Sequence, residues 1–131
     1  MVAEEICGLT FDWDDVGIDD DRVITALDAL VSEHGGNTVW WRVSSSGEGL
    51  HVIIAEAVLL PSMEVILQPI KMNWEIQSEA RKRFGEPPYE LECRGRFISD
   101  SVRHKAGFRT SRIFGVKDGR KSGEWNRWED A

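Results

Sequence analysis

Two strand-forming segments separated by a turn rich in serine and glycine constrain the fold most. The first segment is NTVWWRV (37–43), the turn is SSSGEG (44–49), and the second segment is LHVIIAEA (50–57). β-Branched and aromatic residues dominate both segments, and a short connection that contains glycine is typical of a β-hairpin. The sequence therefore predicts an antiparallel hairpin over residues 37–57.

The residue patterns on either side of this hairpin predict further strands and helices. Asp19 to Asp21 supply N-caps for a helix whose apolar residues recur at helical spacing and which ends at Gly35-Gly36. The other expected elements are a strand at 6–13, a mostly helical stretch at 61–84 that is interrupted near Pro69, a strand at 93–100, a short strand at 112–116, and a tail at 124–131 that is a short helix or frayed.

The main elements follow the order strand, helix, strand, strand, helix, strand. This is the order of the split βαβ, or ferredoxin-like, arrangement, in which helices cover one face of an antiparallel sheet and the other face stays open. In that arrangement the first strand lies between the third and the fourth. We therefore expect one α+β domain over residues 1–131, a length that is typical of a single domain.

Charge is distributed unevenly along the chain, whose net charge is −7. Residues 1–60 contain 12 acidic residues and 2 Lys or Arg, whereas residues 94–121 contain 9 Lys or Arg and 2 acidic residues. This asymmetry indicates a split role, with one part for cations and a basic segment, 94–121, for anions such as nucleotides. A solvated charged surface is the alternative interpretation.

The two cysteines, Cys7 and Cys93, are too few for a disulfide framework or a four-cysteine zinc site. Reduced thiols are the simpler interpretation, and they fit a cytoplasmic protein. No apolar run is long enough to span a membrane, because the longest, around residues 58–70, is broken by two prolines and a glutamate.

Polar residues on the predicted open face are expected to meet from three adjacent strands. Side chains alternate along a strand, so Asp12 and Asp14 share the open face while their apolar neighbours face the helices. By the same alternation the third strand places His51 on the open face, and the fourth strand delivers Asp100. We therefore expect Asp12, Asp14, His51 and Asp100 to converge.

Three carboxylates placed close together repel one another and need a cation to remain ionised. Their oxygens suit Mg²⁺ or Mn²⁺, and two such ions can clamp the attacking and leaving oxygens of a phosphoryl transfer. The pattern thus predicts a two-metal site at Asp12, Asp14 and Asp100, beside the basic segment. The alternative is that the acids of DWDD end a strand and cap a helix, and that His51 is structural.

Three motifs, in this order, resemble those of the archaeo-eukaryotic primase superfamily, which includes the primase-polymerases. They are LTFDWDD (9–15), SSSGEGLHV (44–52) and FISDSV (97–102). The resemblance implies an RRM-like catalytic core that joins nucleoside triphosphates (NTP or dNTP) on a single-stranded DNA template during DNA replication, using two divalent metal ions. It also implies that Asp12, Asp14 and Asp100 are the metal ligands.

The second motif is the most specific of the three. By resemblance, His51 contacts the phosphates of the incoming nucleotide. Ser46, Gly47 and Gly49 belong to the turn before it, and we expect this turn to let the backbone approach a phosphate closely, because glycine has no side-chain bulk.

The segment RTSRIFGVKDG (109–119) also resembles the family's pattern after the third motif. Its Arg109, Lys117 and Gly119 fall at the family's spacing, and the positions where the family carries Pro, Ser and His are occupied by Ser111, Ile113 and Gly115. We expect Arg109, Arg112 and Lys117 to contact phosphates and to offset the charge of the leaving pyrophosphate.

Other functions stay open on the sequence alone. A domain of primase ancestry without catalysis would bind nucleotide or single strands, or serve as an accessory replication subunit, and the three departures after Arg109 favour it. A metal-dependent nuclease and a protein-interaction domain are further alternatives. Trp40 or Trp41 is expected to stack on bases, or else to pack as an ordinary strand residue. A helicase or a larger replication subunit is a candidate partner.

Overall fold

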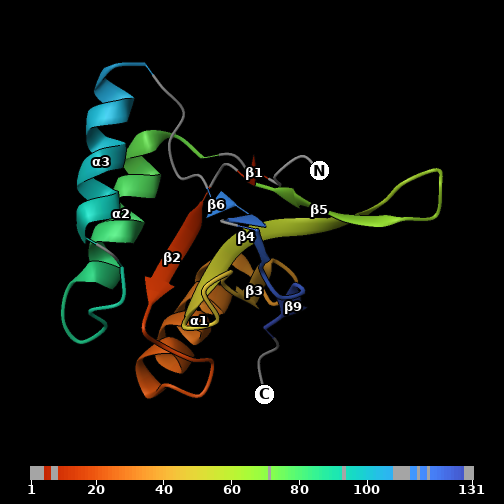
Figure 1. Ribbon diagram of the computed structural model, residues 1–131, viewed down its shortest axis with the longest axis horizontal. Coiled ribbons are helices and arrows are strands. Elements are labelled where there is room, and N and C mark those ends of the chain that lie inside the picture. Colours follow the sequence, from red (N-terminus) through yellow and green to blue (C-terminus); the bar gives the residue numbers. More distant parts are fainter. Residues whose placement is uncertain are drawn as a thin grey trace.

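Antiparallel strands and three helices make up the part of the chain that the computed structural model describes, residues 5–6, 9–70, 72–92, 94–107, 113–114, 116–117 and 119–128 (Figure 1). In chain order the elements are β1 (Glu5–Ile6), β2 (Thr10–Asp14), α1 (Asp21–His34), β3 (Val39–Val43), β4 (Gly49–Leu59), β5 (Val65–Pro69), α2 (Trp74–Gly85), α3 (Arg94–Lys105), β6 (Ile113–Phe114), β7 (Val116–Lys117), β8 (Arg120–Lys121) and β9 (Asn126–Arg127). The expected α+β class is confirmed.

The sheet is organised around β4, which pairs antiparallel with β2 on one side and with β3 on the other. The strand order is β2-β4-β3-β9, and β5 pairs with the outer half of β4. The hairpin predicted over residues 37–57 is confirmed, as is the pairing of the first predicted strand with the third. β4 is longer than predicted, since it continues to Leu59.

The core lies between the sheet and α1. Alternation along the strands buries Phe11 and Trp13 of β2 and Val52 of β4 on the same face, against the apolar side of α1. α1 begins after the N-cap Asp20, whose side chain accepts a hydrogen bond from the Arg22 backbone, and ends at Gly35 with φ 99°. The predicted helix boundaries are therefore confirmed.

A projecting two-stranded arm replaces the first part of the helix predicted over residues 61–84. β4 and β5 continue past the core as a hairpin that extends away from the sheet (Figure 1). The Leu60 N–H donates to the Glu64 carbonyl, and Met63 adopts φ 72° in the turn. The helical prediction was wrong here because a short apolar run fits the spacing of a strand as well as that of a helix. The later part of the predicted helical stretch is confirmed as α2, which begins at Trp74.

The prediction of a strand over residues 93–100 was wrong. Residues 94–105 form helix α3, which packs against α2. Beside β2, where a fourth strand was expected, the described residues make an isolated antiparallel bridge between Trp13 and Glu92. The tail was also predicted wrongly, since residues 126–127 form β9 on the β3 edge. In both places the partner is distant in the sequence, so local pattern carries little information.

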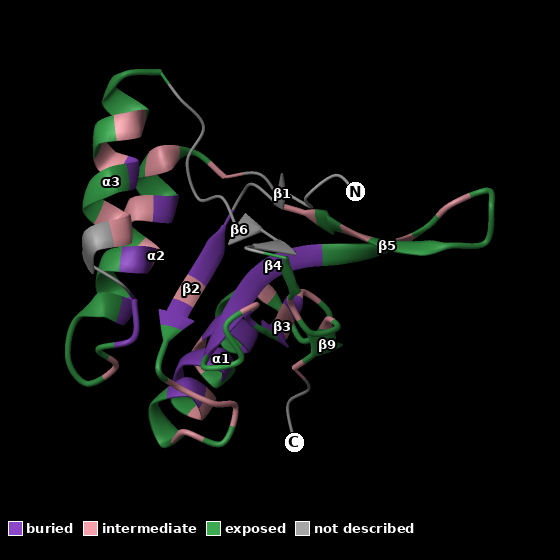
Figure 2. Cartoon of the chain, viewed as in Figure 1, coloured by how far each residue is buried: buried purple, intermediate pink, exposed green. Residues whose placement is uncertain are grey.

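Exposed apolar side chains are concentrated on the arm. Leu59, Met63 and Val65 are 61%, 76% and 65% exposed, and Figure 2 shows most of the arm as exposed or intermediate. Among the described residues, no helix has the length and apolar character needed to cross a membrane.

The core and the arm should differ sharply in their contribution to stability. Phe84 of α2 is fully buried, and its ring lies 5.3 Å from that of Phe11 and 4.9 Å from that of Tyr89. We expect Phe84→Ala to lower the free energy of unfolding by about 3–5 kcal/mol, whereas Met63→Ala changes it by about 0.5 kcal/mol or less. Urea titration of both variants checks this, and equal losses would contradict the assignment of the core.

Candidate functional site

Three polar side chains form a row across the face of the sheet that lies opposite α1. In the strand register Asp12 of β2 pairs with His51 of β4, and His51 pairs with Arg42 of β3. Directly paired residues on antiparallel strands share a face, so these side chains are neighbours. The sequence-based assignment of Asp12 and His51 to one face is confirmed by this register.

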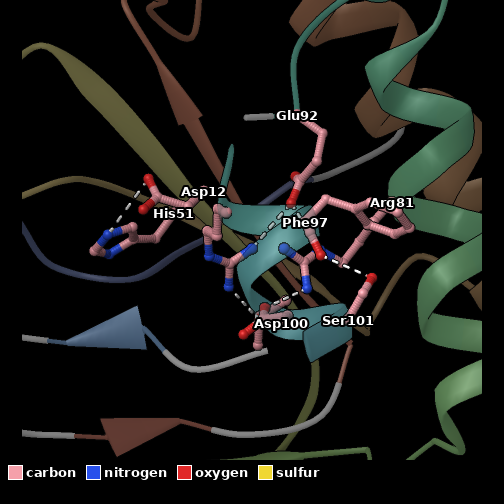
Figure 3. A network of polar contacts seen from close by, with 9 residues as sticks. Asp12, His51, Arg81, Glu92, Phe97, Asp100 and Ser101 are labelled. Atoms are coloured by element: carbon pink, nitrogen blue, oxygen red, sulfur yellow. Dashed lines mark hydrogen bonds and ion pairs between the residues drawn. The ribbon is translucent and has the colours of Figure 1, made fainter. Parts of the chain in front are cut away.

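His51 connects the other two residues of this row. The Arg42 Nε–H donates a hydrogen bond of 3.0 Å to His51 Nδ1, and His51 Nε2 lies 3.9 Å from Asp12 Oδ1 (Figure 3 shows the Asp12–His51 contact). A guanidinium only donates, so Nδ1 is the acceptor and the neutral ring carries its proton on Nε2, facing the carboxylate. His51 is 5% exposed, so it offers Asp12 a fixed N–H and presents little surface to a phosphate.

Asp14 ends β2 on the same face as Asp12, and it is exposed. The next residue, Asp15, lines a hollow of about 620 Å³ formed by the connection from β2 to α1 and by the turn after β3. Its polar lining is mainly acidic: Asp15, Asp19, Asp20 and Glu48. A phosphate would enter this region only together with cations, because like charges repel.

Backbone conformation and strand packing explain the glycines of the Ser/Gly turn without a ligand. Gly47 has φ 75°, a conformation that other residues rarely adopt, and its N–H donates to the Ser44 carbonyl. A Cβ on Gly49 would lie 2.6 Å from the Trp13 carbonyl oxygen, so a side chain here would push β4 away from β2. Ser46 Oγ lies 3.0 Å from Ser44 Oγ and accepts from the Glu48 N–H, which closes the turn.

Asp100 lies on α3 rather than on a strand, and it is buried. Its Oδ2 is 2.5 Å from Arg81 Nη1, and the same arginine donates through Nε to Glu92 Oε1 at 2.7 Å (Figure 3). Arg96 contacts Glu92 Oε1 at 2.9 Å and donates to Thr10 Oγ1 at 3.2 Å. This network therefore ties α2 and α3 to β2.

Glu92 is electrostatically linked to the polar row on the sheet. Burial raises the pKa of its carboxyl, while Arg96 and Arg81 lower it, and the negative charge of Asp12 raises it further. Asp12 is thus close enough for its charge to be felt in the α2–α3 network.

The expected cluster of three carboxylates does not form among the described residues. No group of three or more His, Cys, Asp or Glu side chains in that part of the chain is placed to hold one metal ion. Asp12 and Asp14 share a face with His51, but Asp100 is engaged by Arg81. The strand prediction failed here because α3 buries Asp100 against α2.

The predicted phosphate contacts at Arg109 and Arg112 lie outside the described residues, as do Cys7 and Cys93. Lys117 is in β7, of which the backbone is described.

Sequence reasoning missed Arg42, Arg81, Glu92 and Arg96. The hairpin itself signals Arg42, because alternation places it on the face of Trp40 and the pairing of the two strands sets it against His51. Glu92 and Arg96 stand four residues apart, a spacing typical of helical ion pairs. Arg81 carries no local signal, since its partners are 11 and 19 residues away.

Comparison with known proteins gives no match to a protein family, a curated protein or a solved structure. Function must therefore be inferred from the residues of this chain.

Arg81 and Arg83 provide a matched pair for testing the buried network. Arg81→Met leaves two buried carboxylates without their common partner, so we expect a loss of about 3–5 kcal/mol in the free energy of unfolding. Arg83 pairs with Glu33 at the surface, where both side chains are more than 40% exposed, and Arg83→Met should cost less than about 1 kcal/mol. Denaturant titration distinguishes them, and a small loss for Arg81→Met would contradict a structural role.

Gly49 and Gly36 provide a second matched pair. Gly49→Ala forces the new Cβ against the β2 backbone, and we expect a loss of about 1–3 kcal/mol, whereas the Cβ of Gly36→Ala meets nothing within 4 Å. Chemical denaturation measures both changes. A tolerated Gly49→Ala would contradict the role of Gly49 in the packing of β4 against β2.

Proposed function

We propose that this chain binds a nucleoside triphosphate on the face of β2 and β4 and transfers nucleotides to a primer on a single-stranded template, as a primase-polymerase-type nucleotidyltransferase. The observation that carries this proposal is the register that sets Asp12 and Asp14 of β2 directly opposite His51 and Gly49 of β4. Two motifs that resemble those of the primase superfamily therefore meet at one place in the fold, although they are far apart in the sequence.

The topology supports the same proposal. β2, α1 and β3 form a unit in which β4 lies between the two strands and antiparallel to both, as in the split βαβ arrangement. We propose that the sheet is a reduced RRM-like core, whose edge beside β2 carries the Trp13–Glu92 bridge in place of a fourth strand.

Asp12 and Asp14 fit a site for Mg²⁺ or Mn²⁺, and Asp100 does not fit it in this arrangement. The side chain of Asp12 is 31% exposed and Asp14 is exposed, so both can offer oxygens to a hard cation, with nucleotide phosphates as further ligands. Asp100 is already neutralised by Arg81. A bound divalent ion would supply charge neutralisation at the phosphates and activation of the attacking hydroxyl.

The residues of the chain would orient this chemistry. His51 Nε2 lies 3.9 Å from Asp12 Oδ1, beyond hydrogen-bond distance, and would place an N–H donor beside the metal ligands, while Arg42 fixes the ring from the other side. Lys117, Arg109 and Arg112 remain the proposed contacts to the triphosphate, in the segment that is richest in positive charge. The acidic hollow beside Asp15 makes cations a requirement for phosphate binding there.

The Asp100–Arg81 ion pair favours a second candidate function. A primase-like site that needs three carboxylates would be incomplete while Asp100 is held in the α2–α3 network. The second candidate is therefore a non-catalytic module that binds nucleotide or single strands, as an accessory to replication.

Calorimetry with ATP and dATP, in the presence and absence of Mn²⁺, tests the shared part of both candidates. We expect binding that depends on the metal and that weakens by about tenfold or more in Asp12→Asn and Asp14→Asn, because each variant loses a ligand carboxylate. Glu79→Gln, which changes an exposed acid on α2, is the control for net charge and should bind as the wild type does. Equal affinities in all four proteins would contradict the site.

Primer synthesis on a single-stranded template separates the two candidates. The nucleotidyltransferase makes a product that Asp12→Asn abolishes. Binding without product, in a preparation whose folding is verified by circular dichroism, would assign the chain to the non-catalytic module.

A further inference from the structure

The sheet face opposite α1 was expected to be open, but Arg42, Ile53 and Ala55 on it are buried. This face carries a second feature, an aromatic cavity beside the candidate site. The cavity has a volume of about 400 Å³ and is lined by Trp40 of β3, Trp125 of the C-terminal segment, and Val65, Ile66 and Leu67 of the arm. Ile53 and Ala55 of β4 are fully buried among these residues and form a small cluster separate from the main core. This volume is within the range of small-ligand sites.

The cavity is joined to the candidate site by Arg42. Its guanidinium carbon lies 4.3 Å from the centre of the Trp125 ring, while its Nε donates to His51. A ligand that occupies both the cavity and the candidate site would therefore pass over Arg42 on one face of the sheet. Figure 1 shows the β4–β5 arm running out from the sheet, and Val65, Ile66 and Leu67 of this arm line the cavity together with Trp40 of β3.

The polar groups of the cavity suit a planar, partly polar ligand. Among the described residues, the Trp125 Nε1–H is buried without a hydrogen-bond partner, whereas that of Trp40 donates to the Ala55 carbonyl. A buried donor without an acceptor is costly, and an acceptor that reaches the Trp125 N–H after a small shift of the ring would relieve this cost. The apolar wall formed by the arm would bury the faces of such a ligand.

The charge of Arg127 indicates what a ligand of the cavity carries. Arg127 is exposed, and it belongs to residues 119–128, which contain three Lys or Arg and one acid, Glu124. Arg127 pairs with Trp40 across the β3–β9 edge, so its side chain lies on the same face as the cavity. Aromatic surface flanked by cations is the combination that binds single-stranded nucleic acid, through base stacking and phosphate contacts.

We propose that the Trp40–Trp125 cavity binds a base of a single-stranded nucleic acid, whose backbone runs past Arg127. The identification of this strand with the template rests on the proposed function; the binding itself does not. The arm thereby gains a role, since its exposed apolar residues form one wall of the base site.

The test is binding of a fluorescently labelled oligothymidylate, followed by anisotropy in EDTA and without nucleotide. Under these conditions the metal-dependent triphosphate site takes no part, so this proposal and the proposed function fail separately. We expect wild-type binding that weakens as salt concentration rises, and an abasic strand of the same length that binds about tenfold or more weakly.

Val65 and Val102 offer a matched pair of variants that need not disturb folding. Their exposures are 65% and 63%, and Val102 lies on α3 rather than at the cavity. Val65→Glu should weaken oligonucleotide binding about tenfold or more, while Val102→Glu, with the same change in net charge, should weaken it less than about threefold.

Trp125→Leu and Trp74→Leu form a second matched pair of variants for the oligonucleotide-binding experiment. Trp74 stacks on His104 in the α2–α3 layer, so its loss should leave oligonucleotide binding unchanged, whereas loss of Trp125 should weaken binding as Val65→Glu does. Equal effects within each pair, equal affinity for the abasic strand, or no binding at all would overturn the proposal. A wild-type dimer in light scattering that Val65→Glu dissociates, without oligonucleotide binding, would assign the cavity to a second copy of the chain instead.

Discussion

The pairing of β4 with β2 and β3 is the constraint on which the rest of the structure depends. The register sets Asp12, His51 and Arg42 in one row on one face and the apolar residues of the same strands against α1 on the other. A shift of one residue would exchange the two faces, so burial of the core fixes the position of the polar row. Gly49 serves this pairing directly, because it allows β4 to approach the β2 backbone.

Two electrostatic systems meet at β2. One is the row of Arg42, His51 and Asp12, and the other is the network of Arg81, Glu92 and Asp100 between α2 and α3. In both, an arginine satisfies buried polar atoms that would otherwise be costly to desolvate. The raised pKa of Glu92 reflects its burial first and the charge of Asp12 last, which links the two systems.

The sheet face that holds the proposed triphosphate site continues into the proposed base site. Arg42 contacts both His51 and Trp125, so it stands at the boundary between a polar half and an aromatic half. The polar half suits cations and phosphates, and the aromatic half suits a base. This division is the physical basis of the two proposals, which concern neighbouring parts of one surface.

The sequence by itself determined the elements whose signals are local. Alternation and turn chemistry predicted the β3–β4 hairpin, caps and apolar spacing predicted α1, and alternation alone put Asp12 and His51 on the same face. Tertiary structure decided the conformation of the segments whose partners are distant in the sequence. Residues 61–70 became an arm because β5 could extend the pairing of β4, and Asp100 became helical and buried because Arg81 of α2 neutralises it. Short apolar runs fit either a strand or a helix, so the choice between them is made by the surfaces and charges that the folded chain brings beside them.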